Sequence, residues 1–139
     1  MLIGVPKEIK NNEFRVGLVP NSVAELVHAG HKVTVEAGAG LGAGCSDADY
    51  VSAGATIEKN VEKIFAKADM IVKVKEPQAV ERARLKKGQI LFTYLHLAPE
   101  LAQNHIGRFA PVVSEPRMNQ GIHAIVRQVV SPINIATLL

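Results

Sequence analysis

Four polar side chains follow runs of residues that are expected to form strands. Arg15 lies in the loop after the first apolar run, Lys75 directly follows a second, and Tyr94 and His96 lie at the end of a third. In open parallel sheets, ligands bind beyond the carboxyl ends of the strands. Arginine can grip a carboxylate through two hydrogen bonds, and lysine adds a point charge. We therefore expect these side chains to converge on one small anion.

Each of these residues also has an ordinary structural interpretation. Arg15 can be a solvated loop charge, and Lys75 can pair with Glu76 or another surface acid. Tyr94 can be a half-buried sheet residue, and His96 a hydrogen-bonded core histidine. Their common placement favours a shared site, because acid–base groups cluster in clefts. No metal site is expected, since the other histidines share no ligand spacing with carboxylates or cysteine: His28, His31, His105 and His123.

Short apolar runs alternate with amphipathic helical patterns over the first hundred residues. The expected strands are 2–5, 32–37, 55–58, 70–74 and 89–95. Helices are expected to begin near Pro20, Ser46 and Asn60, with a further one around 80–85. This alternation is typical of an α/β fold with an open, mostly parallel, Rossmann-like sheet and flanking helices.

Local signals predict where the helices begin and end. Ser22 and Glu25 have the spacing of a capping box, and Gly30 is placed to end the same helix. Ser46 and Asp49 form a second capping-box pattern.

Beyond residue 100 the alternation ends. Prolines and glycines break the remaining segment into short pieces, although 99–104 has a helical pattern. We expect one domain over 1–100, followed by an irregular tail over 101–139 that is poorly ordered or aberrant.

Composition narrows the class of protein. A chain of 139 residues with 47% hydrophobic residues can form one core without disulfides. The lone Cys45 suits a reducing compartment, so a cytoplasmic location is expected. The net charge of +3 comes from interleaved charges, which argues against nucleic acid as a partner. No apolar run is long enough for a signal peptide or a membrane span.

A glycine-rich motif at 38–43, with Glu58 further on, is similar to a dinucleotide-binding fingerprint. Here the next helix cannot begin before Ser46, and its first turn carries Asp47 and Asp49. Carboxylates at a helix start would repel a pyrophosphate. The motif is therefore interpreted as a structural loop in preference to a cofactor site.

Four segments together resemble the amino-terminal part of the alanine dehydrogenase family. They are MLIGVPKEIKNNEFRV at 1–16, EAGAGLG at 36–42, KVKEP at 73–77 and LFTYLHLA at 91–98. The related proton-translocating transhydrogenase α subunits share the opening segment and the glycine loop but not the Thr-Tyr-Leu-His segment. The resemblance to alanine dehydrogenase is therefore preferred, and it extends from residue 1 to about 100.

This resemblance implies NAD-dependent, reversible oxidative deamination of L-alanine to pyruvate and ammonia. It implies that Arg15 binds the substrate carboxylate and Lys75 the carbonyl or amino end. His96 would be the catalytic general acid–base group, and Tyr94 would line the pocket. By the same resemblance, NAD is the cofactor, alanine or pyruvate the small-molecule partner, and a homo-oligomer the assembly.

In the family a dinucleotide-binding domain follows, of about 150 residues as such domains usually are. The sequence leaves the family pattern after residue 100 and does not extend through that domain. A frameshift or internal deletion is the simplest explanation, and a genuine short paralogue is the alternative. We therefore expect a substrate-binding domain that is inactive by itself. The alternative is a non-catalytic module that binds small 2-oxo acids or assists assembly.

Overall fold

The computed structural model describes residues 1–94 and 124–125. The elements alternate along the chain from an apolar first strand. They are β1 (Leu2–Val5), α1 (Pro20–His28), β2 (Lys32–Glu36), the 3-10 turn η1 (Leu41–Ala43), α2 (Asp47–Ser52), β3 (Thr56–Glu58), α3 (Val61–Lys67), β4 (Met70–Val72), α4 (Ala79–Arg82), β5 (Ile90–Tyr94) and β6 (Ala124–Ile125).

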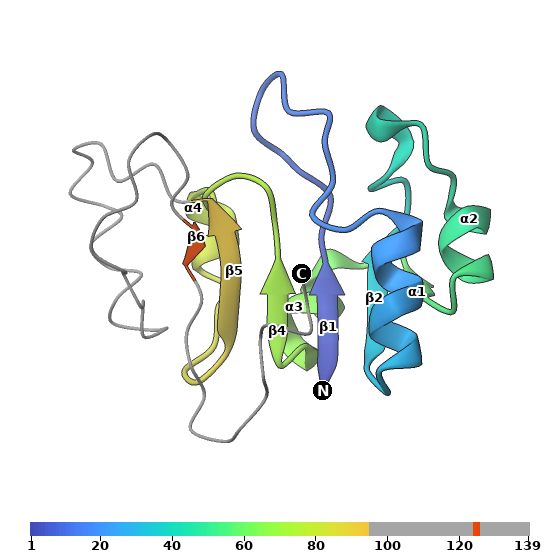
Figure 1. Cartoon of the computed structure of the whole chain (residues 1–139). Helices are drawn as coiled ribbons and strands as arrows, with labels where there is room; N and C mark the ends of the chain where they lie inside the picture. The colour runs from blue at the N-terminus through green and yellow to red at the C-terminus, as the bar shows by residue number, and fades with distance from the viewer. Residues whose placement is uncertain (95–123, 126–139) are drawn as a thin grey trace.

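The strands form one sheet in the order β3-β2-β1-β4-β5-β6 (Figure 1). The first five strands in this order are parallel, and β6 pairs antiparallel with β5. The predicted open, mostly parallel sheet with flanking helices is therefore confirmed. Apart from β6, the tail predicted over 101–139 lies outside the described residues, as does the helix predicted over 99–104. The domain boundary at residue 100 stays a prediction.

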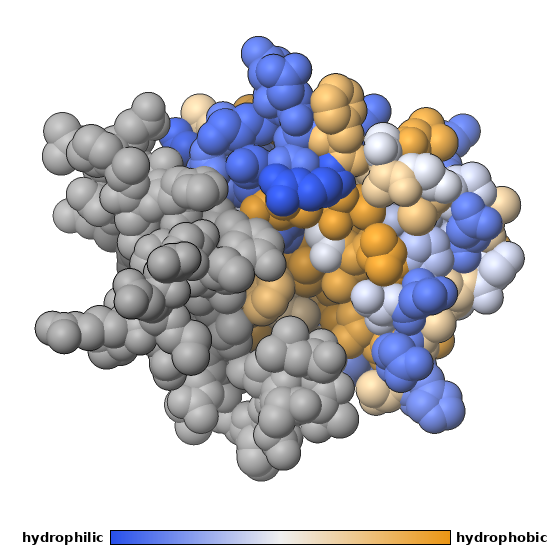
Figure 2. Space-filling model, turned by 45° about the horizontal axis from the view of Figure 1, so that its top comes forward, coloured by the Kyte–Doolittle hydropathy of each residue, from blue (hydrophilic) through white to orange (hydrophobic). Residues whose placement is uncertain are grey.

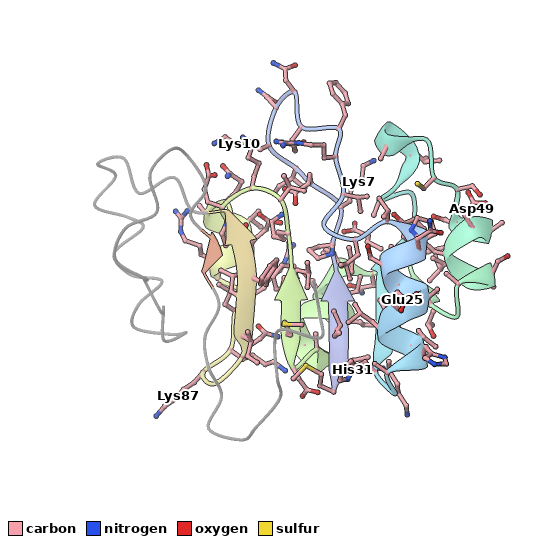
Figure 3. All side chains as sticks on the ribbon, in the orientation of Figure 1. Lys7, Lys10, Glu25, His31, Asp49 and Lys87 are labelled. Carbon is pink, nitrogen blue, oxygen red and sulfur yellow. The ribbon has the colours of Figure 1, made fainter. Side chains whose placement is uncertain are left out.

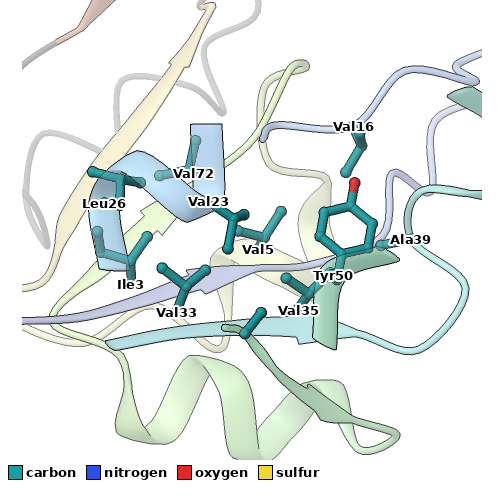
Figure 4. Packing of buried hydrophobic residues seen from close by; sticks show 11 residues of the cluster. Ile3, Val5, Val16, Val23, Leu26, Val33, Val35, Ala39, Tyr50 and Val72 are labelled. Atoms are coloured by element: carbon teal, nitrogen blue, oxygen red, sulfur yellow. The ribbon is translucent and has the colours of Figure 1, made fainter. Parts of the chain in front are cut away.

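Side chains alternate between the two faces along each strand, so both faces carry apolar side chains that must be buried. Helices cover both faces of the sheet. On one face, Val23 and Leu26 of α1 pack against Ile3, Val5 and strand β2 (Figure 4). On the other face, α3 and its C-cap residue contribute three buried side chains to a second cluster with β4 and β5: Ile64, Phe65 and Ala68.

Strand β1 and helix α3 approach closely at a glycine. A Cβ on Gly4 would lie 2.7 Å from Ile64 Cγ2 and 3.0 Å from Ala68 Cβ. Only a residue without a side chain fits there, and β1 can therefore lie directly under the helix.

The helix caps agree with the sequence patterns in two cases and differ in one. The capping box between Ser46 and Asp49 is present, and Asn60 caps α3 through its side chain. The capping box predicted at Ser22 is wrong, because α1 begins at Pro20 and has Val19 at its N-cap. Proline is pre-organised for the first helical position, so Ser22 falls inside the helix.

Candidate anion-binding site

The site lies where the order of the strands reverses. From β1 the chain adds β2 and β3 on one side of the sheet, and it then returns to add β4 and β5 on the other. The connections after β1 and β4 therefore leave neighbouring strands toward opposite sides, which is the arrangement that forms ligand crevices in α/β sheets. Both connections extend beyond the carboxyl ends of the strands (Figure 1).

Arg15 is held by a carboxylate two residues before it. Glu13 Oε1 accepts hydrogen bonds from Arg15 Nε at 2.8 Å and from the Arg15 backbone N–H at 2.9 Å. Glu13 Oε2 accepts a third from Arg15 Nη2 at 2.6 Å. The Arg15 side chain is 65% exposed, whereas that of Glu13 is 4% exposed. The buried carboxylate of Glu13 thus holds a guanidinium whose side chain is largely exposed. Figure 2 shows hydrophilic residues gathered over the carboxyl end of the sheet beside apolar ones.

Glu13 also brings Lys75 to the same place. Lys75 Nζ lies 4.0 Å from Glu13 Oε2, so the two cations share one carboxylate. A turn shapes the loop here: the Glu13 N–H donates to the Lys10 carbonyl, and Asn12 has a φ of 61°. Asparagine tolerates this left-handed conformation better than most residues. The structure thus brings Arg15 and Lys75 together at one carboxylate, and the acid beside Lys75 is Glu13.

The two cations change the acidity of Glu13. Its pKa is lowered from 4.5 to about 2, chiefly by the side-chain hydrogen bonds from Arg15. The Arg15 backbone N–H and the charges of Arg15 and Lys75 act in the same direction, while burial opposes them. Glu13 is consequently ionised throughout the physiological range.

This pKa shift predicts a pH dependence of stability. Because the folded pKa lies below the unfolded value, ionised Glu13 contributes fully above about pH 4.5, and the contribution is lost as the pH falls toward 2. We expect Glu13→Gln to remove this part of the acid sensitivity, at most about 1 kcal/mol because the partner is exposed. Unfolding free energies measured from pH 6 to 2 test it, with Glu25→Gln as control. Parallel curves for wild type and Glu13→Gln would contradict the assignment.

Further contacts join the Arg15 loop to the segment after β4. Glu8 Oε1 accepts a hydrogen bond of 2.7 Å from the Val74 N–H. Lys10, at the carboxyl end of the sheet, forms an ion pair with Glu76 (Figure 3). These contacts fix the loops that carry Arg15 and Lys75 relative to each other.

A buried ionic triad lies under the same two loops. Lys73 Nζ is 2.6 Å from Glu81 Oε1 and 3.2 Å from Glu8 Oε2, and the three side chains are at most 2% exposed. Glu81 Oε2 also accepts the Gln78 N–H at 2.8 Å, which caps α4. The triad thereby links the loop after β1, the end of β4 and helix α4.

Neither Glu13 nor the triad was singled out from the sequence. Lys73 falls inside the strand predicted at 70–74, and its apolar neighbours Val72 and Val74 are a signal of burial. Glu81 had a second signal, because it lies three residues after Gln78 in a capping-box spacing.

Strand β5, which pairs with β4, contacts the segment that carries Lys75. The Thr93 hydroxyl donates a 2.8 Å hydrogen bond to the Lys75 carbonyl. Tyr94 ends β5, but its side chain lies outside the described residues, and so does His96. Their roles as pocket residue and acid–base group stay predictions.

The glycine loop does not fit the pyrophosphate of NAD. The Gly38 N–H, which a phosphate would need, donates a 2.8 Å hydrogen bond to Asp47 Oδ1. Asp47 and Asp49 both lie in the first turn of α2. The anion position at this helix start is therefore taken by the protein's own carboxylates.

The same loop serves packing. A Cβ on Gly40 would lie 2.5 Å from Tyr50 Cε2, and one on Gly42 would lie 2.6 Å from the Phe14 carbonyl oxygen. The glycines thus allow the loop to pack against the backbone next to Arg15. This agrees with the interpretation of the motif as a structural loop.

Within 1–94 and 124–125, no helix is long and apolar enough to cross a membrane. The same residues contain no group of three or more histidine, cysteine, aspartate or glutamate side chains arranged to hold a metal ion.

An open parallel sheet with two cations at its switch point defines an α/β domain with a candidate anion-binding site. Residues 4–110 match the family described as alanine dehydrogenase/PNT, N-terminal domain. The chain therefore belongs to this family, as its sequence motifs predicted.

Individual relatives agree with the family match. The chain is 61% identical to the alanine dehydrogenase of Halomonas elongata over 100 residues, which are 72% of this chain and 27% of the relative. It is 60% identical to that of Methanococcus maripaludis, with the same coverage. The chain thus spans about a quarter of the length of these relatives.

Solved structures show the same fold. An L-alanine dehydrogenase matches with a TM-score of 0.76 and 50% identity, over 82% of this chain and 32% of that one. A transhydrogenase from Sinorhizobium meliloti matches with a TM-score of 0.64 and 35% identity, over 68% of this chain and 28% of that one.

Proposed function

We propose that this chain forms the substrate-carboxylate site of an alanine dehydrogenase and binds pyruvate and L-alanine. The observation that carries the proposal is the Glu13 carboxylate shared by Arg15 and Lys75. Cations that already hold one carboxylate at the switch point have the charge and position to hold another. The relatives named alanine dehydrogenase support the choice of substrate.

The proposed roles follow the chemistry of the side chains. The guanidinium of Arg15 has five N–H donors and a large exposed surface, so it can meet a substrate carboxylate while Glu13 holds it. Lys75 is suited to the carbonyl or amino end of the substrate. His96 is proposed to transfer the proton and Tyr94 to line the pocket.

The complete reaction of the family is part of this proposal. It is the NAD-dependent, reversible deamination of L-alanine, carried out by a cytoplasmic homo-oligomer. The described residues contribute the anion site, and their glycine loop does not fit NAD. Hydride transfer needs a nicotinamide held against the substrate carbon, and the described residues provide no binding site for one.

We therefore expect the 139 residues on their own to bind pyruvate weakly and to form no NADH from alanine. Binding is weak because the exposed Arg15 pair is screened by water and salt. Titration of pyruvate followed by NMR, together with an assay of NADH formation at high alanine, tests both parts. NADH formation by the purified chain would contradict the second part. Absence of any pyruvate shift would contradict the first and leave the assembly module as the better account.

A further inference from the structure

We propose that Glu13 sets the charge preference of the anion site and makes it favour monocarboxylic over dicarboxylic 2-oxo acids. This inference rests on the proposed function, because it concerns the substrate class of the same site. Glu13 would be a specificity-determining residue that cancels one of the two cationic charges.

The charges of the described site support this role. Arg15 and Lys75 supply two positive charges, and Glu13 Oε2 lies within 2.6 and 4.0 Å of their nitrogen atoms. The three groups together carry one net positive charge. The neighbouring pair of Lys10 and Glu76 adds none. A single carboxylate therefore balances the charge of Arg15, Lys75 and Glu13 taken together.

The ionic triad under the two loops adds no excess positive charge to the described site. The triad behind the loops holds two carboxylates, Glu8 and Glu81, against the single ammonium of Lys73. Its net charge is negative when all three groups are ionised. A dicarboxylate would bring a second negative charge to a site that already contains the Glu13 carboxylate.

Glu13 carries a permanent negative charge. Its side chain is 4% exposed and accepts hydrogen bonds from Arg15 through both oxygens. It stays ionised at neutral pH, since its pKa is held at about 2. The negative charge of Glu13 is therefore constant at neutral pH.

The size of the effect follows from Coulomb's law. Removing one negative charge about 6 Å from a second substrate carboxylate favours that carboxylate by about threefold even in water-like surroundings. The lower dielectric near a protein surface increases this factor.

The test compares two acids of equal length. 2-Oxobutyrate and oxaloacetate both have four carbons, and they differ by a methyl group in place of a carboxylate. Their affinities for the full chain, together with that of pyruvate, are measured by NMR titration. Wild type should prefer 2-oxobutyrate. Glu13→Gln should shift the affinity ratio at least about threefold toward oxaloacetate.

Matched variants separate charge from structure. Glu25→Gln removes the same charge from the exposed face of α1 and should leave the ratio unchanged (Figure 3). Glu13→Asp keeps the charge and should keep the preference. Glu13→Ala is a second charge-removing variant if Glu13→Gln does not fold.

The outcomes distinguish this inference from the proposed function. If Glu13→Gln weakens both acids equally, Glu13 only holds Arg15 in place, and the inference is overturned while the anion site stands. If wild type binds neither pyruvate nor 2-oxobutyrate, the proposed function fails and the inference with it.

Discussion

Lys73→Met is expected to lower the free energy of unfolding by about 3–5 kcal/mol, because it leaves two carboxylates buried without their cation. The ammonium group lies 2.6 Å from Glu81 and 3.2 Å from Glu8, and no side chain of the three is more than 2% exposed. Methionine has a similar length, so the change removes the charge with little loss of packing. Urea denaturation of wild type and variant measures the difference.

Two controls show whether charge is the cause. Lys87→Met changes an exposed lysine at the opposite end of the sheet and should stay within about 0.5 kcal/mol of wild type (Figure 3). Combining Lys73→Met with Glu8→Gln and Glu81→Gln should restore much of the loss. Each glutamine still offers an oxygen to the backbone N–H that its carboxylate accepted, from Val74 or Gln78. A triple variant no more stable than Lys73→Met would contradict this explanation.

Gly17→Ala is expected to destabilise the chain by about 3 kcal/mol, the upper part of the usual range for overpacking. The new Cβ would lie 2.6 Å from the Val72 carbonyl oxygen and 2.9 Å from the Val72 carbonyl carbon. These are backbone atoms at the end of β4, so no side chain can move aside. Relief requires the loop that carries Arg15 to move away from β4, and pyruvate binding should weaken with stability.

Gly30→Ala is the matched control for this prediction. Gly30 has a φ of 86° and no atom near its Cβ position, so alanine meets backbone strain without a clash. Its cost should be about 1 kcal/mol, with pyruvate binding unchanged. Equal losses of stability and binding in the two variants would contradict a specific contact between Gly17 and β4.

The fold was accessible from the sequence because its signals are local. Alternating residues at 32–36 and the apolar run at 70–72 mark strands, and the side chains of Ser46 and Asn60 cap the helices that follow them. The error at Ser22 has the same origin, since a capping box and an N-terminal proline compete within one short segment.

The site was only partly accessible, because burial of charge depends on elements far apart in the chain. Arg15 and Lys75 could be placed from the strand ends that they follow. Glu13 could not, because its contact with Lys75 joins the loops after β1 and β4. Glu8 likewise contacts Lys73 across 65 positions of sequence. Interleaved charges of this kind resemble an ordinary solvated surface until the sheet brings them together.

The proposed role of Arg15 in holding the substrate carboxylate is tested most directly by the affinity of arginine variants for pyruvate. Pyruvate is titrated into wild type, Arg15→Lys and Arg84→Lys, and the chemical shifts are followed by NMR. Arg84 pairs with Glu62 at 3.7 Å and serves as the control. Arg15→Lys should weaken pyruvate binding by about tenfold, because lysine keeps the charge but loses the bidentate fork. Arg84→Lys should bind as wild type does. Equal affinity in all three proteins would contradict the assignment of Arg15 to the substrate carboxylate.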